Sequence, residues 1–115
     1  MDRDRVYLLD IPDAARLALS YTKDIAVEEF YKNIQCQDSV IHRLEIIDEA
    51  ARRVSEPTCS AHPEVPGQEM IGLRNVLIYE YDDIDLSVVR HTVRDELPHL
   101  ISTLEAILGS RGTIG

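Results

Sequence analysis

Residues 37–50 read QDSVIHRLEIIDEA and decide the fold class. Apolar side chains in this stretch, and just beyond it, recur every four or three positions, which is the spacing of one face of an α-helix. This stripe consists of Val40, Leu44, Ile47, Ala51 and Val54. Asn33 can cap the start of the helix through its side chain. Ser55-Glu56-Pro57 should end it, because the residue before a proline is pushed out of the α region.

Towards the N-terminus, the spacing predicts a first helix over about residues 4–22. Its apolar stripe is Leu8, Ile11, Ala15, Ala18 and Thr22. Pro12 lacks a backbone donor and clashes with the preceding turn, so a kink or a restart is expected near Asp10. A short helix is expected at residues 27–32, where Phe30 and Tyr31 provide something to bury.

Towards the C-terminus, residues 56–66 contain three prolines and are predicted to be an ordered surface loop. A further helix is expected over about 67–80, and Asp85 is a good N-cap for the last one. That last helix has the stripe Leu86, Val89, Val93, Leu97, Leu100, Leu104 and Ile107. Pro98 predicts a bend within it, and residues 109–112 should close it.

No segment alternates with period two for long enough to predict a strand. The chain is therefore predicted to be one all-α domain over residues 1–115, an up-and-down four-helix bundle with an extra short helix. The helix at 67–80 is apolar on two faces, whereas a small bundle has one interior. An apolar surface of that kind usually marks an interface, so a homodimer is expected.

The formal net charge is −9, which opposes generic nucleic-acid binding because such binding neutralises phosphates with Lys and Arg. Any RNA contact must come from a local basic cluster. No apolar run approaches the roughly 18 residues of a membrane span, and the N-terminus is too acidic for a secretory signal, so a cytoplasmic location is expected. Cys36 and Cys59 fit no metal spacing and are expected to be free thiols. No metal or cofactor is predicted.

Residues 72–81 read GLRNVLIYEY and contain the candidate functional residues. Arg74 and Tyr81 are seven positions apart, so on a helix they share one face. A guanidinium and a phenol placed in this way can contact a phosphate together. The alternative is that both side chains pack and cap the end of a helix, and spacing alone does not decide between these two interpretations.

With the helices placed, the chain resembles the HepT-like branch of the HEPN domains. Residues 37–50 are similar to the family's Q-D-A-V-I-R-x-L-E-I-I-G-E-A. Residues 71–81 are similar to its I-x-G-M-R-N-x-L-x-H-E-Y, with a contraction of one residue at the start. Residues 84–98 are similar to V-D-x-x-x-x-W-x-x-x-x-x-D-L-P. Together these blocks span most of residues 5–108.

The resemblance implies the toxin of a type VII toxin–antitoxin pair: a metal-independent endoribonuclease whose Arg and His line a cleft at a homodimer interface. Its partner would be an MNT-type nucleotidyltransferase antitoxin, which attaches AMP to a Tyr and so silences the toxin. Arg74 matches the family's Arg, Asn75 the polar residue after it, and Tyr81 the modified Tyr. Tyr79 stands where the family has His.

Tyr79 is the main departure from the family pattern. Cleavage by a 2′-hydroxyl needs a group that accepts a proton near neutral pH, and the unperturbed pKa is about 6.5 for His but about 10 for Tyr. Three hypotheses therefore stay open: an endoribonuclease that is active or weakened, a non-catalytic subunit that only binds a nucleotidyltransferase, and a helical bundle with an unrelated role.

A second Arg and His at the family spacing, Arg94 and His99, lie in the block where the family has no active site. His99 is expected on the surface. His42 and His91 are also expected to be solvated. Arg90, His91 and Arg94 would add local positive charge, but a solvated helix face is the favoured interpretation.

Overall fold

The computed structural model of the chain describes residues 2–63 and 86–112. In these ranges every regular element is helical, which confirms the all-α expectation. The elements are α1 (Asp2–Thr22), α2 (Val27–Lys32), α3 (Ile34–Arg53), α4 (Glu56–Ala61), α6 (Leu86–His91), the π-helical turn η1 (Thr92–Glu96) and α7 (Leu97–Gly112). The helix predicted at 67–80 and the cap predicted at Asp85 lie outside the described residues.

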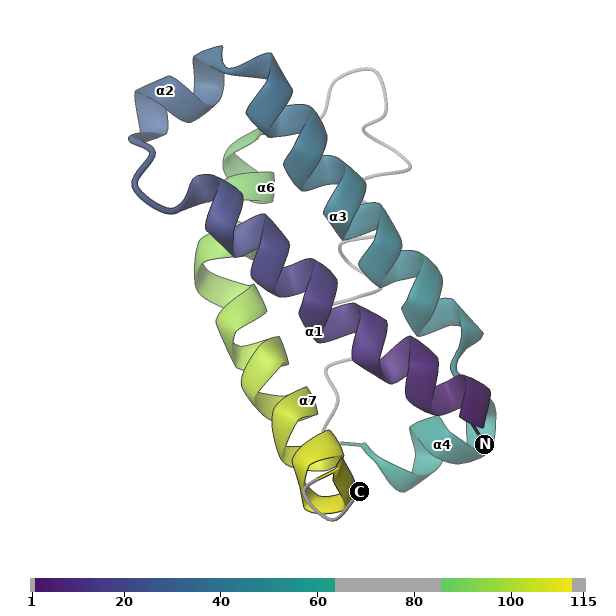
Figure 1. Cartoon of the computed structure of the whole chain (residues 1–115). Coiled ribbons are helices and arrows are strands. Elements are labelled where there is room, and N and C mark those ends of the chain that lie inside the picture. Colours follow the sequence, from purple (N-terminus) through teal and green to yellow (C-terminus); the bar gives the residue numbers. More distant parts are fainter. Residues whose placement is uncertain (1, 64–85, 113–115) are drawn as a thin grey trace.

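Helix α1 lies between α3 and α7 and packs against both (Figure 1). Helix α2 connects the C-terminal end of α1 to the start of α3, and α3 runs in the direction opposite to α1 (Figure 1). Helix α7 also runs opposite to α1 (Figure 1). The three long helices therefore have the up-and-down arrangement that the sequence predicted.

The predicted apolar stripes form the core. All five residues of the first stripe are buried, as are Val40, Leu44 and Ile47 of the second. In the third stripe Leu86 is half-buried and the other six are buried. Phe30 of α2 is fully buried, so its aromatic ring attaches this short helix to the core of the bundle.

The junction between α2 and α3 follows the sequence prediction residue for residue. Helix α2 occupies Val27–Lys32, and Asn33 caps α3, since its Oδ1 accepts a hydrogen bond from the Cys36 amide at 2.9 Å. The Gln37 side chain donates to the Phe30 carbonyl oxygen at 2.9 Å. These bonds satisfy backbone groups that two adjoining helix ends would otherwise leave unpaired.

One sequence prediction was wrong, and a second was wrong in part. Residues 56–61 form helix α4 instead of a loop, because Pro57 lies in the first turn, where its missing N–H costs nothing and its φ already suits a helix. Helix α1 continues through the buried Pro12, so the alternative of a restart near Asp10 is wrong, whereas the alternative of a kink stays a prediction. The predicted end of the last helix is confirmed, since α7 passes through Gly109 and ends at Gly112.

A π-helical turn precedes Pro98, where the sequence predicted a bend. The Leu97 amide donates to the Thr92 carbonyl oxygen, five residues back, so η1 has a wider turn than an α-helix. In an α-helix the ring of Pro98 would clash with the Arg94 carbonyl four residues earlier. The wider turn gives this ring room, and the chain continues into α7 without a break.

Asp4 of α1 holds the start of α4. Its carboxylate accepts hydrogen bonds from the Ser55 amide at 3.1 Å, from the Ser55 hydroxyl at 2.5 Å and from the Thr58 hydroxyl at 2.5 Å. The Ser55 hydroxyl, followed by that of Thr58 and the Ser55 amide, lowers the pKa of Asp4 to about 2. All three bonds favour the charged form of the carboxylate.

Asp4→Ala should therefore destabilise the protein in a pH-dependent manner. The folded-state pKa of Asp4 lies below the ordinary aspartate value of 3.8, so the contribution of Asp4 to stability is complete above about pH 4 and is lost as the pH falls towards about 2. Urea unfolding of the parent and the variant at pH 7, 4 and 2.5 should show a stability difference that shrinks through this window. A difference that is equal at all three pH values would contradict the assignment.

Candidate functional site

The four residues that the sequence singles out for function all lie outside the described residues. Arg74, Asn75, Tyr79 and Tyr81 belong to the stretch 64–85. Their proposed roles therefore stay predictions. The structure does give the scaffold on both sides of this stretch and the other titratable groups of the bundle.

The described elements that flank this stretch are attached near opposite ends of α1. Before it, α4 is bonded to Asp4 in the first turn of α1. After it, Arg94 of η1 donates from Nη1 to the Thr22 hydroxyl, 3.3 Å away, at the last residue of α1. The stretch that contains the predicted site therefore joins elements held near the two ends of the central helix (Figure 1).

The second Arg and His pair is not organised as a site in the described structure. Arg94 is half-buried and donates inwards to Thr22, whereas Pro98 and His99 are exposed. His42 and His91 are exposed as well. The surface positions predicted for the three histidines are confirmed, and none of them is buried in a setting that would prepare it as a catalytic base.

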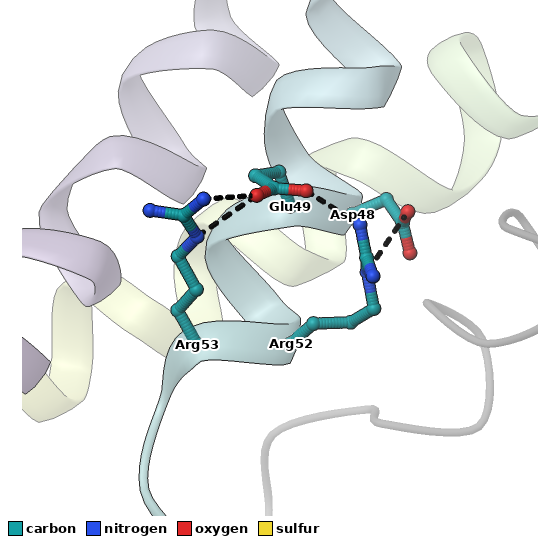
Figure 2. Close-up of polar contacts among 4 residues, drawn as sticks. All are labelled: Asp48, Glu49, Arg52 and Arg53. Atoms are coloured by element: carbon teal, nitrogen blue, oxygen red, sulfur yellow. Dashed lines mark hydrogen bonds and ion pairs between the residues drawn. The ribbon is translucent and has the colours of Figure 1, made fainter.

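The acidic and basic residues at the end of α3 pair with one another. Figure 2 shows Glu49 between two arginines: its Oε1 is 2.5 Å from Nη2 of Arg52, and its Oε2 is 2.8 Å from Nε of Arg53. Nε of Arg52 also lies 3.5 Å from the Asp48 carboxylate. The hydrogen bond to Glu49, with a second contribution from Tyr7, raises the pKa of Arg53. These ion pairs connect side chains within the last turns of α3. Both carboxylates, Asp48 and Glu49, are therefore already paired with arginines and are not free for acid–base chemistry.

Both cysteines are free thiols, as predicted. Cys36 is buried, and burial followed by the charge of Glu29 raises the pKa of its thiol, so it is a poor nucleophile. Cys59 is exposed on α4. Within residues 2–63 and 86–112, no three His, Cys, Asp or Glu side chains are grouped so that they could hold a metal ion. None of the helices in these ranges is both long and apolar enough to cross a membrane.

An open hollow of about 660 Å³ lies where α2 meets α3. Its lining consists of Ala26, Glu28, Glu29, Lys32, Asn33 and Ile34. Two carboxylates face a single ammonium group there, which is unfavourable for a phosphate, and the side chain of Asn33 is already engaged as the α3 cap. This lining does not suit an RNA-cleaving site.

Arg90 and Arg94 were assigned to a solvated face by sequence reasoning, and that assignment is wrong. Both side chains are half-buried, whereas His91 between them is exposed. Nε of Arg90 is shielded from solvent and has no hydrogen-bond partner among residues 2–63 and 86–112. The spacing of four positions, which puts two side chains on one helix face, was the available signal that the two arginines share an environment that His91 does not.

Comparison with known proteins shows which family the chain belongs to. The family model described as "Ribonuclease HepT-like" matches residues 11–107. A protein named "Putative RNase MJ1380" from Methanocaldococcus jannaschii is 36% identical over 103 residues, which cover 90% of this chain and 94% of that protein. "Probable ribonuclease HepT" from Thermococcus cleftensis is 36% identical over 101 residues, covering 88% of this chain and 92% of that protein.

A third relative, "Putative RNase TTE0752" from Caldanaerobacter subterraneus, is 30% identical over 108 residues, which cover 94% of this chain and 96% of that protein. No solved structure matches the chain. The family match covers all of α3, residues 97–107 of α7 and the stretch that contains the predicted site. On its helical fold and on these matches, the chain belongs to the HepT-like ribonuclease family of the HEPN superfamily.

Proposed function

We propose that this protein is the toxin of a toxin–antitoxin pair, an endoribonuclease that works without a metal ion and is silenced when AMP is attached to Tyr81. The observation that supports this function best is the extent of the family match, which runs from residue 11 to residue 107 and includes all of residues 72–81. The relatives named as ribonucleases are matched over nearly their whole length, so the proposal concerns the whole chain.

Arg74, Asn75 and Tyr79 are the proposed catalytic residues. In the reaction, the 2′-hydroxyl of one nucleotide gives up its proton to water as its oxygen bonds to the adjacent phosphorus, the bond from phosphorus to the 5′-oxygen breaks, and that oxygen takes up a proton. The guanidinium of Arg74 binds the phosphate and stabilises its developing charge. Asn75 provides further polar contacts, and Tyr79 donates the proton to the leaving oxygen, since a phenol with a pKa of about 10 is protonated at pH 7.

A second candidate is a non-catalytic subunit that only binds a nucleotidyltransferase. Tyr79 favours it, because a Tyr is a poor base at neutral pH. The net charge of −9 also favours it, because an acidic chain repels RNA and attracts a basic protein. Expression without the partner separates the two candidates: growth arrest supports the toxin, and normal growth at the same protein level supports the subunit.

The proposed assembly is a cytoplasmic homodimer that binds an MNT-type nucleotidyltransferase antitoxin. The dimer follows from the apolar helix expected at 67–80, whose second face needs a partner. Within this assembly, Tyr81 is the proposed acceptor of AMP. Its phenolic oxygen bonds to the α-phosphorus of ATP, the bond from that phosphorus to the bridging oxygen breaks, pyrophosphate leaves, and the phenolic proton passes to a base of the transferase.

AMP transfer should occur on Tyr81 when the chain is incubated with its nucleotidyltransferase, ATP and magnesium. Peptide mapping by mass spectrometry should locate the added group, and Tyr81→Phe should abolish it. The matched control is Tyr79→Phe, which removes the neighbouring phenol and should still be modified. Modification of Tyr79 alone, or no transfer to any residue, would contradict the assignment. In that case, a phosphate attached to Tyr81 next to Arg74 could not explain how the toxin is silenced.

A further inference from the structure

Arg90 and Arg94 form a guanidinium pair on α6 and η1. The two residues are four positions apart, so they project from the same side of the helix. Both side chains are half-buried, and Nη1 of Arg94 donates to the hydroxyl of Thr22, which is itself 3% exposed.

The carboxylates of this helical segment lie beside a histidine instead. His91 lies on the exposed side, with its Nδ1 2.9 Å from the Asp95 carboxylate and its Nε2 3.7 Å from that of Glu96. Among the residues that the structure describes, no carboxylate forms an ion pair with either member of the guanidinium pair. By contrast, Arg16 of α1 is paired with Asp13 and Glu105.

The guanidinium pair is therefore short of acceptors. Two like charges four positions apart on a helix repel one another. Within the described residues, Nε of Arg90 is buried without an acceptor and Arg94 donates to a neutral hydroxyl, so no described carboxylate balances the charge of either side chain. A protein of net charge −9 repels anions overall, so it can bind one only where positive side chains lie together without carboxylate partners. The described surroundings of the guanidinium pair meet this requirement.

We propose that Arg90 and Arg94 together bind phosphate groups of an RNA strand. A guanidinium presents several donors in a planar fork that matches phosphate oxygens, and it keeps its charge at any physiological pH. A phosphate between the two side chains would relieve their repulsion and supply acceptors that the helix itself lacks. This inference rests on the proposed function, because it assigns a contact to the same RNA substrate outside residues 72–81.

The test is the salt dependence of RNA binding by the full chain. The probe is a fluorescent single-stranded RNA with 2′-O-methyl groups, which cannot be cleaved through its 2′-oxygen, and anisotropy is read over a range of salt concentrations. Each phosphate contact to a single strand contributes about 0.7 to the slope of log affinity against log salt. Arg90→Gln and Arg94→Gln should each weaken binding and flatten the slope by about this amount, and the double variant by about 1.4.

Two controls isolate the phosphate contact. Arg16→Gln removes the same charge from a guanidinium that is already paired with carboxylates, and it should leave the slope unchanged. Thr22→Val removes the hydroxyl partner of Arg94 but keeps the guanidinium, and it should also leave the slope unchanged. Circular dichroism of every variant establishes that its helices are retained.

Three results would overturn the inference. If the parent binds and cleaves RNA but the Arg90 and Arg94 variants match Arg16→Gln, the phosphate contact fails and the proposed function stands. If Thr22→Val reproduces the loss of RNA affinity seen in Arg94→Gln, the role of Arg94 is structural: its hydrogen bond to Thr22 holds η1 against α1. If the parent neither binds nor cleaves RNA even at low salt, the inference and the ribonuclease function both fail.

Discussion

Tyr79→His is expected to raise the rate of RNA cleavage by about 10²–10⁴-fold. A positioned general base or acid typically contributes a factor of this size, and an imidazole with a pKa of about 6.5 can accept a proton at pH 7 whereas a phenol cannot. The measurement is cleavage of a labelled RNA in the presence of EDTA. The variant should also acquire a pH dependence centred near the imidazole pKa, and the parent should not show it.

Two further variants make this prediction specific. Tyr79→Phe changes the same residue without adding a base, so it should be no faster than the parent. Arg74→Ala, made in the Tyr79→His background, should remove about 10²–10³-fold of the rate, which is the usual cost of losing one stabilising donor in the transition state. Equal cleavage by the parent and all three variants would place the activity elsewhere or attribute it to a contaminant.

Leu44→Ala is expected to lower the free energy of unfolding more than any other substitution proposed in these predictions. Leu44 is 0% exposed and belongs to the face of α3 that packs against α1. Truncating a buried Leu to Ala typically costs about 2–5 kcal/mol, from lost burial and from the cavity that remains. That is a large fraction of the roughly 5–15 kcal/mol that stabilises a native domain. Thermal unfolding followed by circular dichroism should show Tm lowered by about 10 °C or more.

Leu17→Ala is the matched control for this prediction, because it makes the same chemical change at a residue that is 39% exposed. Surface substitutions are usually within about 0.5 kcal/mol of the parent, so its Tm should barely move. If the two variants unfold at the same temperature, the interface between α1 and α3 is not the main source of stability.

Local patterns predicted the helices well wherever one helix face meets the core. The stripes of α1, α3 and α7 were predictable because burial repeats with the period of the helix. Asn33 was predictable as a cap because capping is a local hydrogen bond. The errors lie at prolines. Whether Pro57 starts a helix or Pro12 interrupts one depends on packing by distant residues, such as the bond between Asp4 and Ser55, and no local window contains that information.

For the functional residues too, local motifs could be predicted from the sequence and long-range contacts could not. Arg74, Asn75, Tyr79 and Tyr81 follow from a motif that the sequence displays, and they stay predictions because they lie outside the described residues. The surroundings of Arg90 and Arg94 could not be predicted in this way. The partner of Arg94 is Thr22, 72 positions earlier in the chain. The spacing of four positions signals only that the two arginines share a helix face, whereas the fold alone brings that hydroxyl within reach of the Arg94 guanidinium.

The π-helical turn holds one residue more than a turn of α-helix, because its hydrogen bond spans five residues instead of four. If one residue were deleted between Thr92 and Glu96, the segment could run as a plain α-helix, and the residues after it would keep nearly the same orientation, with Leu100 and Leu104 still in the core. The cost would be the clash of the Pro98 ring with the carbonyl four residues earlier. A deletion in the middle of α7, where no wide turn can absorb it, would instead rotate everything after it by about 100° about the axis and should be the more damaging of the two.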